Sequence, residues 1–150
     1  MSVVIRPMRE EDLETVSELA MLANPHATKE KYREHVSDEL KENPDLAFVA
    51  VHGDKVVGYV QGDTRGSMTT LEDLAVANNY QGKGIGKQLL KTELEALKKK
   101  GAKIVFAEVH YKNARAIPFY YRHGFRISGF LQDYFGVGHD TIVLKLVFKT

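Results

Sequence analysis

The chain has 150 residues, enough for one ordinary domain with a buried core and too few for two. Lysine and arginine total 21 against 20 for aspartate and glutamate, so the net charge of +1 gives no global attraction to nucleic acid or to an anionic membrane. Cysteine is absent, which excludes disulfides, thiolate zinc sites and cysteine nucleophiles. No signal core or membrane-spanning run is evident. We expect a single cytoplasmic domain over residues 1–150, monomeric or homodimeric, with neither nucleic acid nor membrane as a partner.

The first half of the chain predicts a strand, two helices and a hairpin. Apolar residues recur at helical spacing from Leu13 to Ala23, and Asn24-Pro25 ends that pattern. The short Gly-containing turn His52–Lys55 separates two β-rich runs. The expected elements are a strand at Val3–Ile5, helices at Leu13–Ala23 and from Thr28 through Leu40 to Asn43-Pro44, and strands at Ala47–Val51 and Val56–Val60.

The second half alternates strands and helices before it closes on two strands. The expected elements are a strand at Leu71–Val76 after a turn around Gly66-Ser67, a helix from Ile85 to Leu97 closing at Gly101, a strand at Ile104–Val109, a helix at Ala114–His123 with Gly124 as its C-cap, and strands near Arg126–Phe130 and Thr141–Phe148. The order β α α β β β α β α β β predicts a single α/β domain of the α+β kind. Its sheet is mixed and mostly antiparallel, with seven strands and about four flanking helices.

The most informative segment leads from Leu74-Ala75-Val76 through Gln81-Gly82-Lys83-Gly84 into a helix. A strand that feeds a glycine-rich turn at a helix N-terminus brings backbone N–H groups and the positive end of the helix dipole together. Such a turn predicts an anion site, although it could also be only a tight strand-to-helix connection. Its spacing matches neither the dinucleotide pattern GxGxxG nor the P-loop.

Two motifs together identify a family. Gln81, Gly84 and Gly86 fit Gln-x-x-Gly-x-Gly, which resembles the coenzyme A loop of the GNAT superfamily of N-acetyltransferases. A second set of residues fits N-x-x-A-I-x-[LF]-Y-x-x-x-G-F of the same superfamily: Asn113, Ala116, Ile117, Phe119, Tyr120, Gly124 and Phe125. The resemblance covers the whole chain and implies a GNAT-like fold, acetyl-CoA as cofactor and transfer of an acetyl group to a primary amine.

The resemblance also implies which residues hold the cofactor. On the strand segment Leu74, Ala75 and Val76, the main-chain amides of Leu74 and Val76 would face it, one of them bonding the thioester carbonyl, and the loop residues would hold its diphosphate. Those loop residues are Gln81, Gly82, Lys83, Gly84, Ile85, Gly86 and Lys87. Asn113 would also touch the cofactor, although a role as helix N-cap is the simpler alternative.

Two residues are candidates for the chemistry. Tyr120 matches the tyrosine that protonates the coenzyme A thiolate in many relatives, although it could be only an aromatic core residue. Glu108 places a carboxylate inside an apolar strand, and its spacing to Tyr120 resembles the base and acid of the ribosomal-protein alanine acetyltransferases. A solvent-facing or structurally paired Glu108 is the alternative, and Glu72 and Asp73 are rivals for the base.

The acceptor is the least determined part. The stretch from Asp133 to Thr141 resembles the hairpin that peptide N-terminal acetyltransferases close over their substrate, and Tyr134 is the candidate for an acceptor contact. Gly138-His139-Asp140 departs from the Gly-Glu-Asp usual in those families. The loop near Ala23–Ala27 would form the opposite wall. A peptide or protein α-amine is the first expectation, with a polyamine, amino acid, lysine side chain or aminoglycoside left open.

Other functions compete with this interpretation. A non-catalytic acyl-CoA sensor would need the glycine loop without the chemistry, and a nucleotide-binding domain would use the loop for other phosphates. The six histidines show no metal-binding spacing such as HExxH, so we expect no metal site.

Overall fold

The computed structural model describes residues 2–24, 28–64 and 69–149. The strands are β1 Val4–Pro7, β2 Ala47–His52, β3 Lys55–Asp63, β4 Thr70–Val76, β5 Ile104–His110, β6 Arg126–Leu131 and β7 Thr141–Val147. The α-helices are α1 Leu13–Ala23, α2 Lys29–Glu42, α3 Ile85–Lys99 and α4 Ile117–Arg122. Short 3-10 segments are η1 Glu10–Asp12, η2 Pro44–Leu46, η3 Asn78–Tyr80 and η4 Tyr111–Ala116. The predicted order of strands and helices is confirmed.

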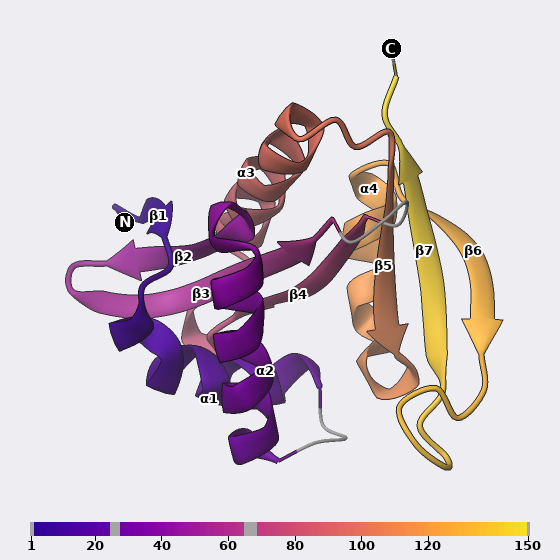
Figure 1. The fold of residues 1–150 in the computed structure, drawn as a ribbon, viewed down its shortest axis with the longest axis horizontal. Helices are drawn as coiled ribbons and strands as arrows, with labels where there is room; N and C mark the ends of the chain where they lie inside the picture. Colours follow the sequence, from indigo (N-terminus) through magenta and orange to yellow (C-terminus); the bar gives the residue numbers. More distant parts are fainter. Residues whose placement is uncertain (1, 25–27, 65–68, 150) are drawn as a thin grey trace.

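The strands form one mixed sheet in the order β1-β2-β3-β4-β5-β7-β6. All neighbours pair antiparallel except β4 and β5, which the α3 crossover makes parallel. Figure 1 shows that the sheet falls into two halves, β1–β4 and β5–β7–β6, which diverge at the junction of β4 and β5. The mostly antiparallel seven-stranded sheet is therefore as predicted.

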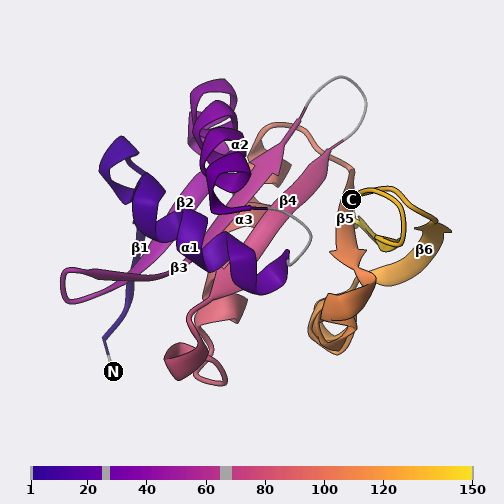
Figure 2. The same cartoon turned by 90° about the horizontal axis from the view of Figure 1, so that it is seen from below.

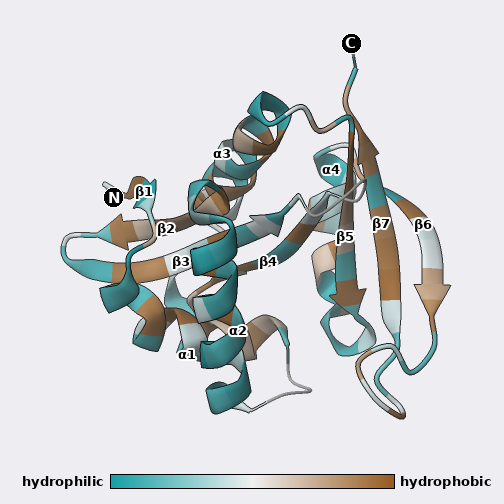
Figure 3. Ribbon diagram, in the orientation of Figure 1, coloured by the Kyte–Doolittle hydropathy of each residue, from teal (hydrophilic) through white to brown (hydrophobic). Residues whose placement is uncertain are grey.

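Helices cover both faces of the first half. Figure 2 shows α1 and α2 on one side of β2–β4, with α3 on the other. Apolar residues of α1 and α2 pack on the sheet together with Val49 and Tyr59, whereas Leu89, Leu90 and Leu97 of α3 pack on the opposite face. Figure 3 shows that α2 is largely hydrophilic, whereas β2 is largely apolar.

Most helix boundaries follow the sequence signals. Thr28 caps α2 by accepting from the Lys31 amide at 3.3 Å, and α1 ends at Ala23 before Asn24 as expected. Gly124 has φ of +98° after α4, and the Phe125 amide donates to the Tyr120 carbonyl, so its predicted C-cap role is confirmed. The predicted turn at Gly66-Ser67 lies outside the described residues.

The helix predicted at Ala114–His123 begins later than expected. Its first part belongs to η4, where Asn113 has non-helical angles, and α4 starts after Ala116. The N-cap interpretation of Asn113 is therefore wrong. Pro118 stands in the first turn of α4, where its missing N–H leaves no helical bond unmade.

None of the described helices is both long enough and apolar enough to cross a membrane.

Candidate active site

The site begins where β4 and β5 separate. Their parallel pairing covers only Thr70 with Phe106 and Leu71 with Ala107, and the Phe106 amide donates to Thr69 at 2.9 Å. Beyond this point the two strands diverge (Figure 1). The sheet is opened from residue 72 of β4 onward, and main-chain groups on that edge face the opening.

A register shift decides which main-chain groups face the opening. Gln61 pairs with Asp73 but Gly62 pairs with Leu71, so Glu72 is an extra residue in β4. Beyond this bulge the Ala77 amide donates to Val57 of β3 at 2.8 Å. Because amides alternate in direction along a strand, those of Leu74 and Val76 turn toward the opening. These are the amides that the sequence analysis assigns to the cofactor.

The glycine loop has the backbone that only glycine adopts easily. Gly82 and Gly84 have φ of +76° and +83°, and Gly84 is the N-cap of α3 without a side-chain cap. No described atom lies within 4 Å of a Cβ added at either position. The glycines are thus required by backbone shape, and the space beside the loop is open. The Gln81 amide group ties the turn to β4 by donating to the Val76 carbonyl at 3.0 Å.

The first turn of α3 presents an anion site to this space. Its leading N–H groups have no helical acceptor, and the positive end of the dipole lies there. Gly86 packs against α4, since a Cβ at this position would lie 3.5 Å from the Phe119 ring. Close approach of α3 and α4 brings Lys87, Arg115 and Arg122 around one cavity, and these three cations favour a phosphate ligand.

A cavity of about 610 Å³ connects the opening of the sheet with the glycine loop. Ten residues predicted to bind the cofactor line it, namely Leu74, Ala75, Val76, Gln81, Gly82, Gly84, Gly86, Lys87, Asn113 and Tyr120. The other two predicted residues do not. Lys83 is exposed beside the loop, and the Ile85 side chain is buried in the core below it.

Several lining residues were missed by sequence reasoning. They are Leu22, Tyr80, Arg115, Ala116, Phe119, Arg122 and His123. Arg115 lies inside the second family motif at a position the pattern leaves free, so composition gave no signal for it. Ala23 belongs to the predicted opposite wall; residues 25–27 of that wall lie outside the described residues.

Tyr120 lies at the inner end of the cavity and is only 7% exposed. Its ring makes edge contacts with Phe119 and Phe125 at centroid distances of 5.3 Å. Burial, and then the negative charge of Asp73, raises the pKa of Tyr120 well above its usual value. The phenol is therefore fully protonated near neutral pH and is available as a proton donor.

A second cavity, of about 250 Å³, is lined by residues of α2, β4 and β5. Three carboxyl groups line it, from Glu72 and Asp73 of β4 and Glu108 of β5. The remaining lining residues are Asn24, Lys31, Tyr32, His35 and Phe135. Asp73 lines this cavity while its neighbour Leu74 lines the first, so the two cavities adjoin at β4.

Burial makes the carboxyl groups of the second cavity weak acids. It raises the pKa of Glu72 to about 8, assisted by the charges of Asp73, Glu39, Glu108 and Asp63. The pKa of Asp73 rises to about 7 for the same main reason, although Asn24 Nδ2 opposes the rise by donating to its carboxylate at 2.9 Å. Groups that titrate near neutral pH in a cavity are suited to proton transfer.

Glu108 has a partner in the loop between β6 and β7. Burial raises the pKa of Glu108, and a hydrogen bond from the Tyr134 hydroxyl opposes that rise. The Tyr134 side chain is half exposed, and the charge of Glu108 raises the pKa of its phenol. Glu108 therefore lines the second cavity and is paired there with Tyr134, and its role as the base stays a prediction.

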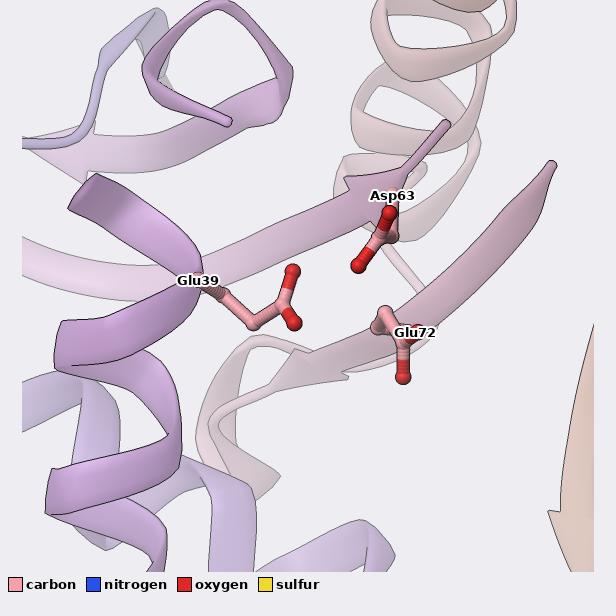
Figure 4. Close-up of side chains that lie close together, drawn as sticks. All are labelled: Glu39, Asp63 and Glu72. Atoms are coloured by element: carbon pink, nitrogen blue, oxygen red, sulfur yellow. The ribbon is translucent and has the colours of Figure 1, made fainter. Parts of the chain in front are cut away.

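Figure 4 shows a further gathering of carboxyl groups, with Glu39 of α2, Asp63 of β3 and Glu72 of β4 pointing toward one another. One carboxylate oxygen from each residue lies within 4.8 Å of the corresponding oxygens of the other two, and Asn43 Nδ2 donates to Glu39 at 3.4 Å. Sequence reasoning missed this cluster because α2, β3 and β4 bring together residues that are far apart in the chain. Its effect on the site is electrostatic, since Glu39 and Asp63 help to raise the pKa of Glu72.

Comparison with known proteins places this geometry in a family. The model of the acetyltransferase (GNAT) family matches residues 13–125. An uncharacterized N-acetyltransferase of Methanocaldococcus jannaschii, MJ1530, is 30% identical over 95% of this chain and 90% of its own. The N-alpha-acetyltransferase of Sulfurisphaera tokodaii is also 30% identical, over 93% of this chain and 90% of its own. The spermidine N(1)-acetyltransferase of Thermoplasma acidophilum is 30% identical over 85% of this chain and 91% of its own.

Solved structures agree on the fold. Ard1 from Thermoplasma volcanium has a TM-score of 0.89 at 22% identity, with complete coverage of both chains. The paia N-acetyltransferase of T. acidophilum, solved with coenzyme A, has a TM-score of 0.80 at 26% identity and covers 99% of this chain and 100% of its own.

The sequence motifs, the divided sheet and the cavity at the glycine loop are those of an acetyltransferase domain. The chain belongs to the GNAT family of N-acetyltransferases, and acetyl-CoA is its cosubstrate. The family match confirms the predicted enzyme class and gives no support to a nucleotide-binding domain.

Proposed function

We propose that this enzyme transfers the acetyl group of acetyl-CoA to the α-amine of a peptide or protein N-terminus. One observation supports the proposal above the others. The cavity beside the glycine loop and the carboxyl-lined cavity adjoin at Asp73 and Leu74, and a protonated tyrosine, Tyr120, lines the first of them. An acyl donor and an amine would thus approach each other from opposite sides of the opened sheet.

The first cavity fits the acyl donor in charge and shape. The N-terminal amides of α3, with Lys87, Arg115 and Arg122, would neutralise its phosphates. The amides of Leu74 and Val76 would bind the pantetheine arm and the thioester oxygen, where negative charge develops as the amine attacks. Lys83 is left out of this set because its side chain does not line the cavity.

The chain supplies both proton transfers. Glu108 would accept the proton that the attacking amine loses, and the Tyr120 hydroxyl would give a proton to the departing thiolate. The bond between the amine nitrogen and the acetyl carbon forms, and the bond between that carbon and sulfur breaks. Asp73 is the alternative base, because its pKa of about 7 suits the task and its charge reaches Tyr120.

The choice of acceptor rests on amine chemistry. An α-amine with a pKa near 8 is roughly one-tenth neutral at pH 7, whereas a lysine near 10.4 is neutral about once in 2,500 molecules. A weak base in the site can therefore recruit an α-amine more readily. The N-alpha-acetyltransferase relative supports the same choice.

A polyamine is the second candidate, because three carboxyl groups line the acceptor cavity and two more adjoin Glu72. Such a cavity favours an acceptor with additional positive charge. A spermidine acetyltransferase stands among the relatives.

The compartment and the oligomeric state, monomer or homodimer, stay predictions.

The test is a thiol-release screen with acetyl-CoA against N-terminal peptides and polyamines, with mass spectrometry to locate the acetyl group. Acetylation of a peptide α-amine with a kcat/KM well above that for spermidine is the expected result. The reverse preference would replace the peptide by a polyamine. Tight acetyl-CoA binding without thiol release from any amine would favour the acyl-CoA sensor.

A further inference from the structure

The loop between β6 and β7, residues 132–140, forms one wall of the acceptor cavity through Phe135 and carries Tyr134 to Glu108. The loop is closed on itself. The Asp133 amide donates to the Asp140 carboxylate at 2.8 Å, and the Gly138 amide donates to the Asp133 carboxylate at 2.7 Å. These bonds tie the two ends and the middle of the loop together. Contacts between the loop and the rest of the protein therefore determine the position of Tyr134.

One anchor is a pair of histidines. His110, at the end of β5, is 2% exposed, and its Nε2 lies 3.0 Å from Nδ1 of His139 in the loop. The His110 ring stacks on Tyr111 at 4.8 Å and on Phe135 at 6.1 Å between centroids. His110 thus contacts the cavity wall directly and is hydrogen-bonded to the end of the same loop.

The hydrogen bonds determine where the protons are. The Lys112 amide donates to His110 Nδ1 at 3.1 Å, so this nitrogen has no proton. His110 Nε2 then carries the proton and donates it to His139 Nδ1. Both rings are neutral in this arrangement. The bond from the Lys112 amide keeps the proton of His110 on Nε2, and that proton makes the bond to His139.

We propose that His110 and His139 form a neutral hydrogen-bonded pair that positions the β6–β7 loop for acceptor binding. They are positioning residues that act through Tyr134 and Phe135. The inference rests on the proposed acceptor site, since the loop lines that site.

The arrangement requires a neutral His110, because a proton on His110 Nδ1 would face the Lys112 amide and remove that bond. The pKa of His110 is lowered by burial and then by His139 and Lys112, whereas Asp140 opposes the shift. These are the charged groups that act on His110 from the loop and from η4.

The decisive comparison uses two substitutions in the full chain. Asn at position 139 places Oδ1 where histidine has Nδ1, so His139→Asn keeps an acceptor that does not titrate. His139→Ala removes the acceptor. We expect amide exchange of Phe135 and Gly138, corrected for intrinsic rate, to accelerate about fivefold or more in His139→Ala, the size of one lost hydrogen bond.

The conservative variant supplies the second readout. In His139→Asn, exchange of the same two amides should stay close to that of the unsubstituted chain. Amide exchange of Val109 in β5 is the internal control for the fold. Nitrogen NMR of the rings should show His110 protonated at Nε2 and not at Nδ1 at pH 7.5.

Three results would overturn the proposal. They are a His110 ring protonated at Nδ1 at pH 7.5, loop exchange unchanged by His139→Ala, and loop exchange accelerated as much by His139→Asn as by His139→Ala. These measurements need neither acceptor nor acetyl-CoA, so they stand if the peptide assignment fails. With an active acceptor, His139→Ala should raise the acceptor KM and leave the acetyl-CoA KM unchanged, and His139→Asn should restore the acceptor KM.

Discussion

Two adjacent tyrosines of α4 provide a matched test of the acid. The Tyr120 hydroxyl is buried at the cavity, whereas the Tyr121 side chain is 54% exposed beneath Arg126, with the guanidinium 3.8 Å from the ring centroid. Tyr120→Phe should lower kcat about a hundredfold, the range of a lost general acid, with little change in acetyl-CoA affinity. Steady-state kinetics and calorimetry measure the two effects.

The control is Tyr121→Phe, which removes the same atom one residue away and should leave kcat unchanged. Normal turnover of Tyr120→Phe at saturating acetyl-CoA would remove Tyr120 from the acid role.

The identity of the general base can be tested by measuring how kcat/KM depends on pH. Because burial raises the pKa of Glu108, its base form should be lost as pH falls through that raised pKa, and kcat/KM should fall on the acid side. Glu108→Gln should lower kcat/KM and flatten this limb. If Asp73→Asn flattens the limb and Glu108→Gln leaves it in place, Asp73 is the base.

Glu93 is a buried carboxyl group without a role in the proposed chemistry. It is fully buried on α3, and neither oxygen has a hydrogen-bond partner among the described residues. Burial raises the pKa of Glu93 well above its usual value. Its contribution to stability is therefore present at low pH and is lost as pH rises from the pKa of the unfolded state toward that of the folded state. Glu93→Gln should raise the free energy of unfolding at pH 7.

Thermal unfolding at two pH values checks this. Each kcal/mol gained corresponds to about 2 to 4 °C in Tm for a chain of this size. The gain should shrink toward pH 4, where both carboxyl and amide are neutral. Glu95→Gln, at an exposed position of the same helix, is the control and should change little. Equal Tm values for Glu93→Gln and the unsubstituted chain at pH 7 would contradict the prediction.

At the scale of elements, the glycine loop is the feature to perturb. Gly84→Glu places a side chain and a negative charge in the open space beside the N-terminus of α3. We expect acetyl-CoA affinity to fall by at least tenfold, measured by calorimetry, because phosphate must approach the same amides.

Gly53 is the matched position, since it also has positive φ, at +68°, and open space around its Cβ, but lies in the turn between β2 and β3. Gly53→Glu carries the same backbone strain and should retain acetyl-CoA affinity. Equal affinity in the two variants would mean that the loop does not hold the phosphates.

Sequence periodicity predicted most elements because their apolar stripes are long, as in α1 and α3. It failed at η4, where six residues with a kink at Asn113 replace the first part of the predicted helix. Hydrophobic spacing cannot separate a 3-10 turn from an α-helix over so short a stretch. The extra residue Glu72 in β4 was equally invisible, because a bulge depends on the partner strand.

At the scale of the whole molecule, the two halves of the sheet pair at two positions among the described residues, Thr70 with Phe106 and Leu71 with Ala107. The larger cavity has walls from both halves. A ligand that fills it should therefore join them. Acetyl-CoA at about 100 times its Kd should stabilise the protein by about 2.7 kcal/mol and raise Tm by roughly 5 to 10 °C.

ATP at the same concentration is the control ligand in that experiment. It shares the phosphates but not the pantetheine arm, so its shift should be smaller. Protection by ATP equal to that by acetyl-CoA would mean that the opening between β4 and β5 contributes nothing to binding.

The candidate site could be predicted only where its residues are neighbours in the chain. The loop from Gln81 to Lys87 and the α4 motif are local patterns, so the sequence alone indicated ten residues that line the larger cavity. The pairing of His110 with His139 and the cluster of Glu39, Asp63 and Glu72 depend on the tertiary structure. No local pattern indicates them.

In the proposed contact, β4 meets the ligand through the peptide groups of Leu74 and Val76, so substitution of those side chains need not alter it. The contact depends on the path of the main chain, including the extra residue at position 72. The fold itself tolerates wide divergence in sequence, because Ard1 from Thermoplasma volcanium shares it with a TM-score of 0.89 at 22% identity. The acceptor wall is built from side chains, so each substitution there changes the contact with the acceptor. Substitutions in this wall can therefore change which acceptor is bound.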